Sequence, residues 1–187
     1  DSKHFQEKAD YVRDFIRTLA RYKVNMLIWE WEDKLAYESH PDVGAPGAFT
    51  IEQMREFTRF ARKYHIQIVP LVQGLGHVSF IQKHPQYRHL REIESSNWQN
   101  NALHEGTYEL MFDLWDEAIE ATPGSEYFHI GTDETWELGR GATAEKAKEI
   151  GRRGLLLHFI QRAHDHLAAK GRKVMSWGGR YEPGEDR

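Results

Sequence analysis

Residues 128–134 read Phe-His-Ile-Gly-Thr-Asp-Glu, a short apolar run that ends on two adjacent carboxylates, Asp133 and Glu134. Residues 126–130 are predicted to form a buried strand, and Gly131 allows another part of the chain to approach the backbone closely. The carboxylates follow the carboxyl end of that strand, where parallel α/β proteins hold their catalytic groups. Adjacent side chains of an extended segment point apart, so the two groups can differ in environment and protonation state. The alternative is a surface loop with a chance acidic pair; the strand and the glycine favour a site.

Helical and strand patterns alternate along the chain. Strands are predicted near 24–30, 66–72, 126–130 and 172–177, and helices over about 5–19, 50–64, 106–121 and within 144–169. Thr50, followed by Gln53 three residues later, predicts a capping box at the start of the second helix. Residues 84–104 are irregular and polar and are expected to form a functional loop over the strand ends. The order predicts βα units with parallel strands and with helices on one outer side.

These elements amount to about half of an eight-stranded (β/α) barrel, which typically needs ~250 residues. The alternative is a complete, small, doubly wound domain, whose first strand normally leads into a glycine-rich phosphate turn. The first strand here ends in Trp29-Glu30-Trp31-Glu32, which contains no glycine. No repeat or linker divides the chain, so residues 1–187 are expected to be part of a single domain. Because Asp1 leads almost directly into a helix, the true N-terminus is expected to lie upstream.

Composition excludes some chemistry and leaves the compartment open. The net charge of −4 gives no reason to expect nucleic acid or an anionic membrane as a partner. The sequence has no run long enough to span a bilayer, no signal-peptide pattern and no cysteine, which excludes disulfides and thiolate chemistry. His164 and His166 are two residues apart on a helix and point to different faces, so no metal or other cofactor is expected.

Each predicted strand ends in polar or aromatic residues. These ends are Glu30 to Asp33, Gln73 with His77, Asp133 with Glu134, and Trp177 with Arg180. In a barrel the carboxyl ends of the strands meet on one rim, so residues far apart in the sequence are expected to line one pocket.

Several of these segments resemble one known family. Residues 129–134 resemble the His-x-Gly-Gly-Asp-Glu signature of the family 20 glycoside hydrolases, the β-N-acetylhexosaminidases, with Thr132 in place of the second glycine. Residues 23–27 resemble the family's Lys-x-Asn strand entry, residues 70–77 its Pro-Glu-x-Asp-x-Pro-Gly-His strand end, and residues 173–177 the strand that brings a pocket tryptophan. The resemblance implies a TIM-barrel catalytic domain of which this chain covers the second to fifth strands, with the remainder supplied by sequence outside it.

The resemblance also implies a reaction. Glu134 is expected to be the general acid, and later the base that activates water, in an exo-acting hydrolase of terminal N-acetylglucosamine or N-acetylgalactosamine residues. Asp133 is expected to hold the acetamido N–H while the substrate's own acetamido oxygen attacks, as in the substrate-assisted families. The alternative for Asp133 is a cap on a following helical turn. By analogy with the family, a periplasmic or secreted location is plausible.

Supporting residues follow from the same motifs. His77 corresponds to a histidine that the family uses in a relay near the acid, and a structural hydrogen-bonding role is the alternative. Leu71, Gln73 and Leu75 depart from the family's Glu, Asp and Pro, and Gln73 cannot supply a negative charge to orient a histidine. His129 is expected to pack beneath the site.

Trp177 and Asp33 are the expected substrate-binding residues. Trp177 is expected to form the pocket wall, with a role in the core as its alternative. Asp33 belongs to the acidic cluster of residues 30–33, which is expected either to bind sugar hydroxyls or to be a solvated loop.

Two other functions remain open on the sequence. A glycosidase of another barrel family would use a separate carboxylate nucleophile. A sugar-binding relative would retain the scaffold without turnover.

Overall fold

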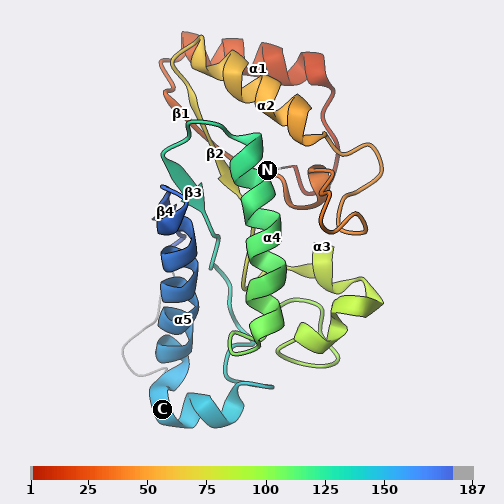
Figure 1. Ribbon diagram of the computed structural model, residues 1–187, viewed down its shortest axis with the longest axis vertical. Coiled ribbons are helices and arrows are strands. Elements are labelled where there is room, and N and C mark those ends of the chain that lie inside the picture. The colour runs from red at the N-terminus through yellow and green to blue at the C-terminus, as the bar shows by residue number, and fades with distance from the viewer. Residues whose placement is uncertain (1, 179–187) are drawn as a thin grey trace. The chain divides into compact units, whose positions relative to one another are not determined.

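The computed structural model describes residues 2–178 as two compact units. The first unit holds residues 2–72 and 113–129, and the second holds residues 73–112 and 130–178. The elements are α1 (Ala9–Arg21), β1 (Met26–Glu30), η1 (Glu32–Lys34), α2 (Ile51–Arg62), β2 (Gln67–Leu71), α3 (Ser79–Gln82), η2 (Pro85–Leu90), α4 (Glu105–Ala121), β3 (Tyr127–His129), α5 (Ala144–Ala169) and β4 (Lys173–Met175) (Figure 1). All four predicted strands are present, each shorter than predicted.

The first unit is built on three strands that run in parallel. β1 pairs with β2 from Met26 opposite Gln67 to Glu30 opposite Leu71, and β2 pairs with β3 at Leu71 and His129. α1 and α2 lie side by side, and α2 packs on β2 (Figure 1). These parallel pairs agree with the βα units that the sequence predicts.

Local sequence signals account for the helices of this unit. Thr50 caps α2 with the full capping box, because its side chain accepts from Gln53 N and the Gln53 side chain accepts from Thr50 N. In the sequence, Phe5, Val12, Phe15 and Ile16 repeat at helical spacing, which predicts one buried face. The structure buries Val12 and Ile16. The prediction is wrong for Phe5, which precedes the helix and is 62% exposed, and for Phe15, which is 40% exposed.

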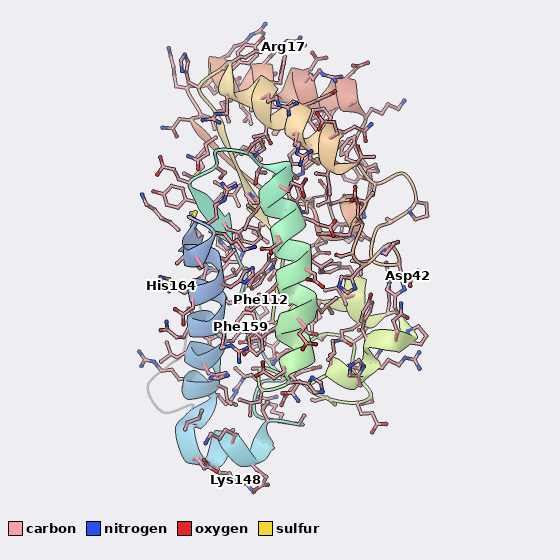
Figure 2. All side chains as sticks on the ribbon, in the orientation of Figure 1. Arg17, Asp42, Phe112, Lys148, Phe159 and His164 are labelled. Carbon is pink, nitrogen blue, oxygen red and sulfur yellow. The ribbon has the colours of Figure 1, made fainter. Side chains whose placement is uncertain are left out.

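The second unit packs α5 against the first half of α4. Phe159 of α5 lies 5.9 Å from Tyr108 of α4, measured between ring centroids, and Phe112 stacks on His166 at 3.9 Å. Figure 2 shows Phe112 and Phe159 between the two helices. α5 has a break at Gly151, whose backbone is not helical, so the single long helix predicted from the sequence is two helical segments.

The second unit also positions the residues that follow β3. Ile130 N donates to Met175 O of β4 at 2.9 Å, and Trp177 N donates to Gly131 O at 2.8 Å. These two hydrogen bonds hold the start of the segment 130–134 beside β4. Within residues 2–178, no helix is both long and apolar enough to cross a membrane.

Candidate active site

The segment after β3 turns sharply before it presents its carboxylates. Gly131 and Thr132 have φ values of 73° and 75°, and Glu134 has a φ of 49°. The left-handed region suits glycine, and a β-branched residue such as threonine is strained there. Residues in such conformations persist where the surroundings hold them, and they are concentrated at active sites.

The loop after β2 packs directly on this turn. A Cβ atom added to Gly76 would lie 2.9 Å from the main-chain oxygen of Asp133, so only glycine permits this approach. His77, the next residue, also has a left-handed backbone, with φ 57°. The close approach of the two loops brings the imidazole to the acidic pair.

His77 contacts both carboxylates. Its Nε2 atom lies 3.2 Å from Oδ2 of Asp133 and 3.2 Å from Oε2 of Glu134. This nitrogen is buried and makes no aligned hydrogen bond with the described residues, so both contacts are at ion-pair distance without directed hydrogen bonding. The negative charge that Gln73 cannot supply is therefore provided to His77 by Asp133 and Glu134 themselves.

Gln73 contacts Asp133 instead. Its side chain is 1% exposed, and its Nε2 donates to Oδ1 of Asp133 at 3.0 Å. The two oxygens of Asp133 therefore face two different neighbours, an amide N–H and an imidazole nitrogen. Within residues 2–178 the Glu134 carboxylate contacts His77 alone, and its side chain is 49% exposed.

Trp98 joins the site from the irregular loop over residues 84–104. Its ring centroid lies 4.3 Å from that of His77, and its Nε1 donates to the main-chain oxygen of Glu134 at 2.9 Å. The main-chain oxygen of Trp98 accepts a hydrogen bond from Val78 N at 3.1 Å. Trp98 thus contacts both His77 and Glu134.

A buried amide anchors this loop. Asn100 is fully buried; its main-chain N donates to Leu75 O at 2.9 Å, and its Nδ2 donates to Gly74 O at 3.0 Å. Gln82 donates to its Oδ1 from α3. Buried polar groups with partners on all sides fix a single arrangement, so the loop holds Trp98 in register with His77.

The arrangement suits acid–base chemistry with two carboxylates in different surroundings. Asp133 is held on both oxygens and is the more enclosed of the two, which suits a fixed, orienting role. Glu134 is more accessible, which suits proton transfer to a leaving group. Among residues 2–178 no group of three or more His, Cys, Asp or Glu side chains is placed to hold a metal ion.

The comparison with protein families agrees with this geometry. The model of the glycosyl hydrolase family 20 catalytic domain matches residues 1–185. The chain belongs to glycosyl hydrolase family 20. Its sheet and helices are therefore part of the family's TIM barrel, and it is a partial catalytic domain of a glycoside hydrolase.

Two curated relatives and two solved structures are similar to this family 20 chain. Hexosaminidase D from Bos taurus is 28% identical over 174 residues, covering 91% of this chain and 50% of the relative. Hexosaminidase D from Homo sapiens is 29% identical over 147 residues, covering 78% of this chain and 30% of the relative. The chain therefore spans half or less of these relatives. A Flavobacterium johnsoniae chitobiase structure superposes with a TM-score of 0.82 at 25% identity, covering 94% of this chain and 30% of that one. A Vibrio harveyi exo-β-N-acetylglucosaminidase structure, in complex with N-acetylglucosamine, shares the fold, with a TM-score of 0.78 at 23% identity and coverage of 94% and 34%.

The second unit of this family 20 chain contains most of the predicted site residues. It brings His77, Asp133 and Glu134 together, and the main chain of Trp177 is tied to Gly131 beside them. The Trp177 side chain is 44% exposed, so it is not part of the core. Arg180 lies outside the described residues.

His129 and Asp33 belong to the first unit. His129 ends β3 and is 1% exposed, a burial that matches packing. Asp33 lies in η1 and pairs with Lys34. Its neighbours Glu32 and Lys34 are each only 7% exposed, so the solvated loop considered for this cluster is wrong.

Glu32 is the most perturbed carboxyl of that cluster. Burial raises its pKa from 4.5 to about 7, although Lys3 opposes the shift. The Lys3 ammonium lies 3.1 Å from Glu30 and 3.5 Å from Glu32, so one cation is shared between two acids. A buried carboxyl that shares its only cation with a second acid is more stable in its neutral form.

Sequence reasoning missed Trp98. The loop over residues 84–104 was expected to be functional, but no pattern in it distinguishes one residue from another. The available signal was a large aromatic within the polar stretch Ser95-Ser96-Asn97-Trp98-Gln99. An aromatic side chain contributes most when it is buried, so a tryptophan in a polar loop indicates packing against another segment.

Proposed function

We infer that the protein containing this chain is an exo-acting β-N-acetylhexosaminidase that hydrolyses terminal N-acetylhexosamine residues by a substrate-assisted retaining mechanism. The observation that carries the proposal is the pair Asp133 and Glu134 at the end of β3, each 3.2 Å from the same imidazole nitrogen, in a chain of family 20. The names of the relatives, hexosaminidase and chitobiase, support the same substrate class.

In this mechanism Glu134 protonates the glycosidic oxygen as the bond breaks. The acetamido oxygen of the substrate attacks the anomeric carbon, and a cyclic oxazolinium forms as the leaving alcohol departs. Asp133 accepts the acetamido N–H and stabilises the positive charge that develops there. Water, deprotonated by Glu134, then opens the ring and restores the acetamido group with retained configuration. His77 lies between the carboxylates and contacts both.

The test uses the full-length protein and aryl N-acetylglucosaminides whose leaving groups differ in acidity. Glu134→Ala should lose roughly 10²–10⁴-fold in rate with a poor leaving group and much less with an activated phenol, which needs little protonation. Equal losses for both leaving groups would show that the acid is assigned to the wrong residue.

Asp133 is tested with the same substrates. Asp133→Ala should slow both, because internal attack precedes departure of either leaving group. Asp133→Asn should also be impaired, since the amide keeps the shape and loses the charge that faces the oxazolinium. Full activity of Asp133→Ala would remove substrate assistance from the proposal.

A further inference from the structure

Gln73 is a buried amide whose donor group is directed at one catalytic carboxylate. It lies two residues after the end of β2, it is 1% exposed, and its Nε2 lies 3.0 Å from Oδ1 of Asp133. The opposite loop makes room for it, because a Cβ atom added to Gly131 would overlap the Gln73 amide group. Gly131 therefore leaves the space that the Gln73 amide occupies when it donates to Asp133.

The hydrogen bond leaves Asp133 able to bind a substrate. Oδ1 accepts from Gln73 and Oδ2 lies 3.2 Å from His77, so the plane of the carboxylate is set by two neighbours. Each carboxylate oxygen has two lone pairs, so either can still accept a further N–H.

The amide of Gln73 differs from a carboxyl group placed at the same position. A carboxyl group can donate to Asp133 only while it holds its own proton, and it repels Asp133 once that proton is lost. The side-chain amide of glutamine does not titrate, so its donation is the same at every working pH.

We propose that Gln73 is a positioning residue for the reaction, which orients Asp133 through a hydrogen bond that does not depend on pH. This assignment rests on the proposed function, because it acts through the role of Asp133 toward the acetamido group. Gln73 acts through its contact with Asp133.

The first experiment replaces the donor in the full-length protein and measures kcat/KM against pH. Gln73→Glu keeps the shape of the side chain. Near pH 5 the introduced carboxyl shares a proton with Asp133 and can donate to it, so activity should stay within a few-fold of the wild type. Toward pH 7.5 that proton is lost, and activity relative to the wild type should fall by about 10-fold or more.

The matched control is Gln73→Met, which fills similar space without a donor. Its activity should be low at every pH, and its ratio to the wild type should not change with pH. His77 and Glu134, the other titratable groups at this site, are present in all three proteins, so taking the ratio removes their contribution. A ratio for Gln73→Glu that is constant with pH, or full activity of Gln73→Met, would mean that Gln73 only fills space and would overturn the proposal.

A second measurement does not depend on turnover. The introduced carboxyl of Gln73→Glu is pushed toward its neutral form by Asp133, so its ionisation opposes folding as pH rises above the ordinary pKa of glutamate. The gap in Tm between this variant and the wild type should therefore widen from pH 4.5 to pH 7.5, while that of Gln73→Met stays constant. A constant gap for Gln73→Glu would overturn the contact with Asp133. If the gap widens but the wild type hydrolyses no N-acetylhexosaminide, the proposed function fails, and the catalytic part of this assignment fails with it.

Discussion

At the residue scale, Thr132 has the least favourable backbone of the turn that carries Asp133 and Glu134. It is a β-branched residue with φ 75°, and its side chain is buried. A non-glycine residue in this region costs roughly 1–3 kcal/mol. The family signature that residues 129–134 resemble has a glycine here, which agrees with the conformation that the structure shows.

Thr132→Gly should therefore stabilise the protein by about 1 kcal/mol. The relieved strain exceeds the roughly 0.5–1 kcal/mol of additional chain entropy that glycine brings to the unfolded state. The free energy of unfolding from urea titration checks this. Thr135→Gly is the matched control, because Thr135 is also buried but has no positive φ, so it should lose stability. A loss of similar size in both variants would show that Thr132 carries no strain.

At the element scale, the site depends on two loops that meet without side chains between them. The segment after β2 reaches the turn after β3 at Gly76, where a Cβ atom would lie 2.9 Å from Asp133 O and 3.4 Å from Glu134 O. Both contacts are to main-chain atoms, which cannot rotate away as a flexible side chain can. The spacing of His77 from the carboxylates is therefore set by the packing of backbone on backbone.

Gly76→Ala should separate these loops. It should lower activity by more than the loss of folding stability would explain. Overpacking of this kind typically costs about 1–3 kcal/mol, and a shift near 1 Å at a catalytic group can cost on the order of 10²-fold in rate. The measurements are kcat/KM and Tm in the full-length protein. Gly171→Ala is the control, since Gly171 has φ 75° after α5 but open space around it. That variant should lose stability with its activity retained; a retained activity in Gly76→Ala would contradict this account.

The elements could be predicted from the sequence where local signals decide them. Thr50 and Gln53 form the expected capping box, and the four strands lie where apolar runs place them. The acidic pair could be found because Asp133 and Glu134 lie within five residues of the end of their strand. The contacts of Trp98 and Gln73 could not, since both depend on how separate loops fold back on the turn. Phe5 and Phe15 were placed in the core because periodicity shows which residues share a face, and it does not show whether that face is covered.

At the scale of the whole molecule, the cluster at the end of β1 couples stability to pH. Glu32 is 7% exposed, has a left-handed backbone with φ 42°, and shares Lys3 with Glu30. Burial raises its pKa to about 7, from an ordinary value of 4.5. Between these two values the unfolded chain is ionised at this residue, while the folded chain holds a proton. Stability from this group is therefore present below about pH 4.5, falls as pH rises through the window, and is lost above about pH 7.

Glu32→Gln should remove this pH dependence. The pKa difference corresponds to about 3 kcal/mol at most, and the lost contact with Lys3 offsets part of it, so the variant should be about 2 kcal/mol more stable than the wild type at pH 8. At pH 4.5 the two should be nearly equal, because folded Glu32 is then neutral. The comparison is the free energy of unfolding at both pH values in the full-length protein. Glu109→Gln, at an exposed position on α4, should change it by less than about 0.5 kcal/mol at either pH. An equal pH dependence in wild type and Glu32→Gln would mean that this carboxyl stays ionised in the folded protein.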